Sequence, residues 1–122
     1  MTTIELPFPP STNSIWRNAR SRTIKSDRYR EWANAAGWAL KQQRPRKVKG
    51  QVHITLCFEE KDERRRDLDN LVKAALDLLV AHRVIEGDDS RYVRAIDLRW
   101  GNCAGCRVTI EQAGQSDALP RI

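Results

Sequence analysis

The chain has 122 residues, 40% of them hydrophobic, which is enough for one modest core and too few for two ordinary domains. No stretch reaches the roughly 18 unbroken apolar residues of a membrane helix, and the N-terminus lacks the pattern of a secretory signal, so we expect a cytoplasmic protein. Lys and Arg outnumber Asp and Glu by 22 to 16, a formal net charge of +6. This charge favours polyanions such as nucleic acid, although it is also common in proteins without such a partner.

The first half of the chain predicts a strand, a loop and a helix. Thr3 to Leu6 is typical of a short strand, which ends at the Pro-rich stretch Pro7 to Pro10 because proline lacks a backbone donor and fixes φ. Ser11 to Lys25 shows neither helical nor strand periodicity and is expected to form an arm over the surface. An amphipathic helix, capped by Ser26, then runs to about Gln43.

The second half predicts a strand, a helix and two further strands. Apolar residues alternate from Val52 to Phe58, as in a half-buried strand. Leu68 to His82 is dense in Leu, Val and Ala and predicts a largely buried helix, followed by a loop over Arg83 to Ser90. Two alternating runs on either side of Gly101 to Gly105 indicate an antiparallel hairpin.

Together these elements predict an α+β fold: a single small domain with a mixed four-stranded sheet and two main helices on one side. The domain is expected to cover residues 1–112, and residues 113–122 to form a polar, frayed tail. Cys103 and Cys106 form a C-x-x-C, the spacing of zinc knuckles and redox motifs. No second pair accompanies them, and the three cysteines are an odd number, so we interpret this stretch as a turn with reduced thiols.

The most informative segment runs from Arg64 to Lys73 and reads Arg-Arg-Arg-Asp-Leu-Asp-Asn-Leu-Val-Lys. If the helix begins near Leu68, then Asp69, Lys73 and Asp77 share one of its faces. Asp67 lies two residues before Asp69, in a segment that can aim both carboxylates to one side. Carboxylate oxygens suit a hard cation such as Mg²⁺.

A structural interpretation of the same acids is that they cap the helix and that Asp69 forms an ordinary surface ion pair with Lys73. The adjacent arginine triplet and a second acidic pair, Asp88-Asp89, support a metal site, but from the residues alone Asp88-Asp89 is more typical of a turn, so both interpretations stay open. A helix of about 15 residues is ~22 Å long. Acids at its two ends could therefore share a metal only if the loop folds back or the next strand starts beside the first turn.

The string Arg-Arg-Asp-Leu-Asp-Asn-Leu-x-Lys from Arg65 to Lys73, followed by Val84 to Asp89, resembles the signature of the RusA family of Holliday junction resolvases. Ser11 to Asn13, after the Pro-rich turn, resembles the family's N-terminal Pro-Pro-Ser-x-Asn element. The resemblance covers Ile4 to about Glu111. It implies a Mg²⁺-dependent endonuclease, with Mn²⁺ as a substitute, that resolves Holliday junctions by paired phosphodiester hydrolysis in DNA recombination and repair.

Carried over residue by residue, the resemblance implies four catalytic residues, of which the three acids also hold the metal: Asp67, Asp69, Lys73 and Asp89. This chain has one more residue, Gly87, before the acidic pair than some relatives have, which leaves Asp88 as a substitute for Asp89. The expected contacts to DNA are polar or basic side chains that match phosphate oxygens: Asn13, Arg17, Arg20, Arg22, Lys25, Arg64, Arg65, Arg66 and Asn70.

The expected partners are a four-way DNA junction and a second copy of the chain, because two strands are cut symmetrically; no membrane or small-molecule substrate is expected. Three alternatives stay open: a non-catalytic branched-DNA-binding protein, an endonuclease that acts on forks, flaps or duplex, and an inactive relative with a structural or inhibitory role.

Overall fold

The computed structural model describes residues 1–11, 16–19, 22–25, 27–60 and 67–113. Its elements, in chain order, are β1 (Thr2–Leu6), β2 (Trp16–Ala19), β3 (Arg22–Lys25), α2 (Asp27–Gln43), β4 (Val52–Glu59), the 3₁₀ turn η1 (Leu68–Asn70), α3 (Val72–Ala81), β5 (Val93–Gly101) and β6 (Cys106–Gln112). None of the helices in these ranges is long and apolar enough to cross a bilayer.

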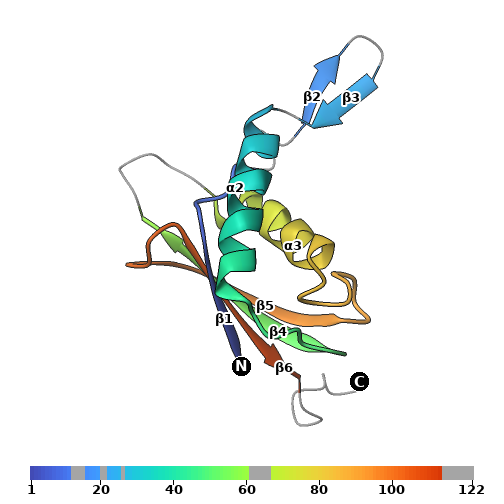
Figure 1. Ribbon diagram of the computed structural model, residues 1–122, viewed down its shortest axis with the longest axis vertical. Coiled ribbons are helices and arrows are strands. Elements are labelled where there is room, and N and C mark those ends of the chain that lie inside the picture. The colour runs from blue at the N-terminus through green and yellow to red at the C-terminus, as the bar shows by residue number, and fades with distance from the viewer. Residues whose placement is uncertain (12–15, 20–21, 26, 61–66, 114–122) are drawn as a thin grey trace.

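A four-stranded sheet in the order β1-β6-β4-β5 forms the main layer, and α2 and α3 lie on one side of it (Figure 1). The sheet is mixed, because β6 runs antiparallel to both β1 and β4 whereas β5 runs parallel to β4. The predicted α+β fold, with a mixed four-stranded sheet and two helices, is therefore confirmed. Of the predicted tail, the residues beyond Ala113 lie outside the described part of the chain.

The core lies between the sheet and the two helices. In β4, Val52, Ile54, Leu56 and Phe58 are buried, and the alternate residues are half-buried on the other face. Helix α3 is largely buried, as predicted, and Ala74, Ala75 and its three leucines pack into the same cluster. The apolar side chains that recur every second residue in the strands and every third or fourth residue in the helices thus meet in one layer. Their removal from water is the main term that stabilises the folded state.

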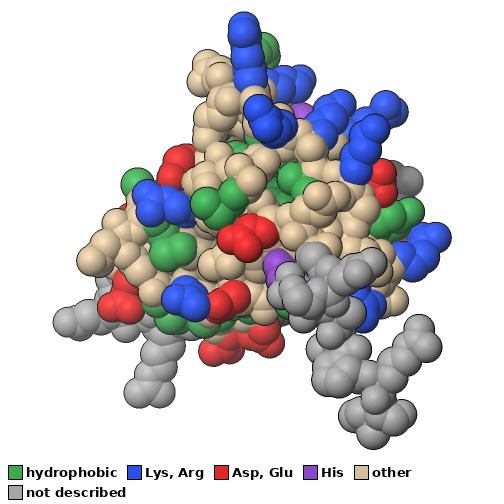
Figure 2. Space-filling view, turned by 90° about the horizontal axis from the view of Figure 1, so that it is seen from below, with side chains coloured by type: hydrophobic (Ala, Val, Ile, Leu, Met, Phe, Trp, Pro, Cys, Tyr) green, Lys and Arg blue, Asp and Glu red, His purple; other side chains and the backbone are tan. Residues whose placement is uncertain are grey.

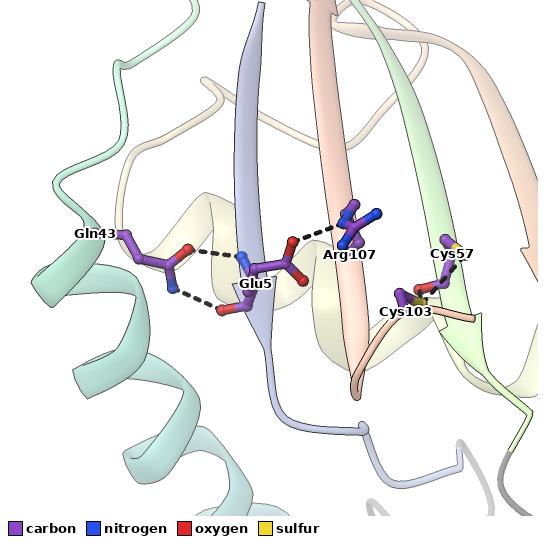
Figure 3. A network of polar contacts seen from close by, with 5 residues as sticks. All are labelled: Glu5, Gln43, Cys57, Cys103 and Arg107. Atoms are coloured by element: carbon purple, nitrogen blue, oxygen red, sulfur yellow. Dashed lines mark hydrogen bonds and ion pairs between the residues drawn. The ribbon is translucent and has the colours of Figure 1, made fainter. Parts of the chain in front are cut away.

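The outer edge of β1 is closed by a side chain from α2 (Figure 3). Gln43 accepts a hydrogen bond from the backbone N–H of Glu5 through Oε1 and donates one to its carbonyl through Nε2, both at 2.7 Å. The amide side chain thus satisfies the backbone groups that a neighbouring strand would otherwise bind. Blocking an edge in this way disfavours pairing with another chain.

The predicted antiparallel hairpin of β5 and β6 is wrong, because β4 lies between these two strands. The connecting turn crosses the end of β4: the N–H of Glu59 donates to the carbonyl of Gly105 at 2.8 Å, and the N–H of Gly105 donates to Glu59 Oε1 at 2.9 Å. Gly105 has a φ of +68°, a conformation that glycine adopts without steric cost. The alternation was correctly interpreted as strand, but the turn signal did not specify which strand is the partner.

The predicted surface arm over Ser11 to Lys25 is also corrected, because β2 and β3 pair antiparallel, from Trp16 opposite Lys25 to Ala19 opposite Arg22. This two-stranded ribbon is separate from the main sheet. It lacks an apolar alternation, so periodicity could not reveal it. The predicted cap, Ser26, lies outside the described residues, and α2 itself begins at Asp27 and ends at Gln43 as expected.

Helix α3 ends in a Schellman motif that turns the chain back toward the core. The N–H of Val84 donates to the carbonyl of Leu79 at 2.9 Å, and that of Arg83 to the carbonyl of Val80 at 3.0 Å. Arg83 occupies the left-handed position with a φ of 59°. An L-residue with a Cβ is strained in this conformation.

We therefore expect Arg83→Gly to raise the free energy of unfolding by about 0.5–1 kcal/mol, because glycine relieves the strain at a moderate cost in unfolded-state entropy. Urea unfolding followed by circular dichroism measures this change. Arg30→Gly, at an exposed position within α2, is the matched control and should lower stability by about 1 kcal/mol. Destabilisation by both variants would contradict the assigned strain at Arg83.

Candidate active site

The segment that enters α3 is extended at Asp67, with φ −97° and ψ 128°, and then forms η1. The N–H of Asn70 donates to the carbonyl of Asp67 at 3.1 Å, and that of Leu71 to the carbonyl of Leu68 at 3.0 Å. These i to i+3 bonds define a 3₁₀ turn, so the α-helix starts at Val72 and not near Leu68 as expected. Asp69 consequently belongs to η1.

The carboxylates of Asp67 and Asp69 are both exposed to solvent. Asp67 is the N-cap of η1, yet its side chain makes no capping hydrogen bond. Over the described ranges, neither acid takes part in a side-chain hydrogen bond or an ion pair. The structural interpretation, in which these acids cap the helix and pair with Lys73, therefore does not describe their surroundings.

Lys73 lies in the first turn of α3 and donates a hydrogen bond from Nζ to Asp77 Oδ1 at 3.0 Å. This hydrogen bond is the main cause that raises the pKa of Lys73, and the charges of Asp77, Asp88 and Tyr29 raise it further. Lys73 therefore stays protonated at neutral pH. It is a fixed positive charge beside the entry segment, not a proton acceptor.

The charge of Asp88 also raises the pKa of Lys73, so the loop after α3 lies within electrostatic reach of this side chain. Helix α3 has ten residues, about 15 Å, and so is shorter than expected. After the Schellman turn, Val84 and Ile85 are each only 1% exposed, and the N–H of Val48 donates to the carbonyl of Val84 at 2.8 Å. In addition, β5 contacts η1, so the next strand passes beside the entry segment.

Gly87 allows this loop to close against Tyr92. A Cβ at residue 87 would lie 2.7 Å from Tyr92 Cδ2, closer than side-chain carbons approach. The backbone is then fixed to β4, since the N–H of Val52 donates to the carbonyl of Tyr92 at 2.7 Å. Residue 87 can lie this close to the ring of Tyr92 only because it has no side chain.

The two acids of the loop have different surroundings. The carboxylate of Asp89 accepts hydrogen bonds from Arg91: 2.9 Å from the backbone N–H, 3.1 Å from Nε and 2.8 Å from Nη2. The side-chain hydrogen bond of Arg91 is the main cause that lowers the pKa of Asp89. Asp88 is exposed, interacts with Lys73 through its charge, and forms no side-chain hydrogen bond within the described residues.

The structure does not gather the predicted ligands into one compact cluster. Within the described ranges, no three His, Cys, Asp or Glu side chains lie close enough together to hold a metal ion. It does bring Lys73, Asp77 and Asp88 into one electrostatic neighbourhood, with Asp67 and Asp69 on the preceding turn. The sequence analysis did not predict that Arg91 is the partner of Asp89. The spacing of an acid and an arginine two residues apart in a turn could have indicated this ion pair.

Several predicted DNA contacts cannot be placed. Asn13, Arg20, Arg64, Arg65 and Arg66 lie outside the described residues. The remaining basic members of the set have their backbone in the β2–β3 ribbon, where side chains are not described: Arg17, Arg22 and Lys25. On the face in Figure 2, Lys and Arg side chains are most numerous toward the upper border of the view.

Comparison with known proteins identifies the family. The family model described as Endodeoxyribonuclease RusA matches residues 7–111, which include the entry segment, α3 and the returning loop. The chain belongs to the RusA family.

Three RusA relatives give the extent of the similarity. A protein named crossover junction endodeoxyribonuclease rusA from Enterobacteria phage HK97 is 31% identical over 109 residues, which cover 85% of this chain and 90% of the relative. Proteins of the same name from Enterobacteria phage 82 and Escherichia coli (strain K12) are 39% and 36% identical over 85 and 83 residues. Each of these two alignments covers 62% of this chain and 64% of the relative.

Proposed function

We infer that this RusA protein is a Mg²⁺-dependent crossover junction endodeoxyribonuclease, which resolves Holliday junctions by hydrolysing paired phosphodiester bonds. Its relatives carry the name of this activity. One observation supports the inference most directly. The exposed carboxylates of Asp67 and Asp69 lie just before the helix whose first turn carries the cationic Lys73. This combination suits phosphoryl transfer, in which negative charge must be neutralised.

The chemistry of these residues suits a hard divalent cation, because exposed carboxylates with no side-chain hydrogen bond or ion pair among the described residues provide the oxygen ligands that Mg²⁺ prefers. We assign the ligand role to Asp67, Asp69 and Asp88. When bound, the ion polarises the phosphate and lowers the pKa of a water molecule. Asp88 takes precedence over Asp89, since the carboxylate of Asp89 is occupied by Arg91.

Lys73 provides positive charge at the phosphoryl oxygens. Its protonated state follows from its raised pKa, and its hydrogen bond to Asp77 limits the positions that its ammonium group can reach. We assign Asn70, which lies in η1 before the helix, the role of orienting a ligand or a phosphate oxygen. The arginine triplet Arg64 to Arg66 and the basic ribbon would bind the DNA backbone without reading bases.

One chain provides one such site, whereas resolution of a four-way junction requires two symmetric cuts. A two-fold homodimer on the junction therefore fits the proposed reaction. An enzyme of this kind works in the compartment that contains the DNA. A cytoplasmic location is therefore what we propose for this protein.

The proposal is tested by comparing cleavage of matched four-way, forked and linear DNA of equal length and sequence. We expect Mg²⁺-dependent cleavage of the four-way junction at least about 100-fold faster than of the linear duplex, paired symmetric cuts, and complete loss in excess EDTA. Mn²⁺ should restore activity after EDTA treatment. Equal rates on all substrates would contradict junction resolution, and binding without cleavage would favour a non-catalytic protein.

A further inference from the structure

A pair of thiols lies on the sheet face opposite the buried residues of β4 (Figure 3). Cys57 is on β4, and its side chain lies on the face opposite the buried residues of that strand. Cys103 is in the turn between β5 and β6. The Sγ of Cys103 lies 3.2 Å from the Sγ of Cys57 and 3.0 Å from its backbone oxygen. The two residues are 46 positions apart in the chain, so the fold alone brings them together.

The neighbouring residues make room for this contact. A Cβ on Gly101 would lie 2.5 Å from the Sγ of Cys57, so only glycine permits the thiol to occupy its position. Cys106, the second cysteine of the C-x-x-C, is not part of the pair. It lies opposite Phe58 in the sheet register, is fully buried, and burial raises the pKa of its thiol to about 12.

The two thiols differ in exposure and in charge environment. Cys57 is half-exposed and lies in the sheet between Arg99 on β5 and Arg107 on β6. Asp97 and Glu5 are the main causes of the raised pKa values of these arginines, and the charge of Cys57 adds to both. Cys103 is only 5% exposed, and burial raises the pKa of its thiol. A partly exposed thiol on a strand flanked by two arginine positions, with a buried thiol 3.2 Å away, suits a reactive cysteine and a resolving cysteine.

We propose that Cys57 and Cys103 are a redox modification site, at which a hydroperoxide oxidises the pair to a reversible disulfide that locks the β5–β6 turn onto β4. The Cys57 thiolate attacks one peroxide oxygen, the O–O bond breaks, and Cys57 becomes a sulfenic acid. The sulfur of Cys103 then attacks the sulfur of Cys57, the S–O bond breaks and water leaves. Two thiols and hydrogen peroxide thus give one disulfide and two waters, and a dithiol reductant reverses the change.

The test treats the folded full-length protein with hydrogen peroxide, removes the peroxide, alkylates the remaining thiols after denaturation and maps peptides by mass spectrometry. We expect a peptide pair linked through Cys57 and Cys103 that has lost two hydrogen atoms, one alkylated thiol at Cys106, and reversal by dithiothreitol. The thermal midpoint should rise by about 5 °C or more, because the crosslink closes a long loop in the unfolded chain.

The variants separate this pair from other thiol chemistry. Cys57→Ser and Cys103→Ser should each abolish the crosslink and the rise in Tm, whereas Cys106→Ala should retain both. A crosslink between Cys103 and Cys106, a disulfide between two chains, or three unmodified thiols after treatment would each overturn the proposal. Because every readout is independent of DNA cleavage, failure here and failure of the proposed nuclease activity are distinguishable.

Discussion

Replacement of Asp69 by Asn should abolish Mg²⁺-dependent cleavage of a four-way junction while leaving binding of the junction intact. The substitution preserves the shape of an exposed side chain and removes only the negative charge that would hold a cation. We expect the single-turnover cleavage rate to fall by on the order of 10²–10³-fold. Junction affinity depends on basic side chains and phosphates, so it should change by no more than about 3-fold at a fixed salt concentration.

Asp97→Asn is the matched control for this experiment. Asp97 is also exposed, but it pairs with Arg99 on the outer side of the sheet at 2.7 Å, and surface pairs of this kind contribute little to stability. This variant should cleave and bind as the unmodified protein does. Unchanged cleavage by Asp69→Asn would refute the metal assignment, and joint loss of binding and cleavage would point to a role of Asp69 in positioning DNA.

The second large effect concerns the two neighbouring acids of the loop, where Asp88→Asn and Asp89→Asn should differ strongly. Asp88 is available and interacts with Lys73, so its replacement should lower cleavage by about 10²-fold or more. Asp89 accepts hydrogen bonds from Arg91, so its replacement should lower cleavage by less than about 10-fold, through local disorder of the turn. Single-turnover rates on the same junction measure both.

Metal rescue distinguishes a ligand from a structural acid at this position. Asp88→Cys should be inactive with Mg²⁺, which prefers oxygen, and should recover part of its activity with Mn²⁺, which accepts softer ligands. The same pattern at Asp89, together with an active Asp88→Asn, would reverse the assignment. In that case Arg91 would have to release the carboxylate of Asp89 when the metal binds.

The role of Asp67 could not be decided from the sequence. An acid at a helix start is usually a cap, and nothing in the residue pattern tells whether its side chain bonds to the backbone. The structure places Asp67 in extended backbone without that bond. Likewise, the spacing of Lys73 permitted an ion pair with either Asp69 or Asp77, and the 3₁₀ turn, which moves Asp69 off the helix, leaves Asp77 as the observed partner.

By itself the sequence determined the α+β class and the bounds of β4 and α2, because periodicity depends on near neighbours in the chain. The candidate site residues came from the motif that resembles the RusA family. Only the tertiary structure decided that β4 separates β5 from β6, that the loop carrying Asp88 lies within electrostatic reach of Lys73, and that Cys57 meets Cys103. The physical reason is the same in each case. These contacts join residues 15 to 60 positions apart, and packing of the whole core, not local propensity, selects such partners.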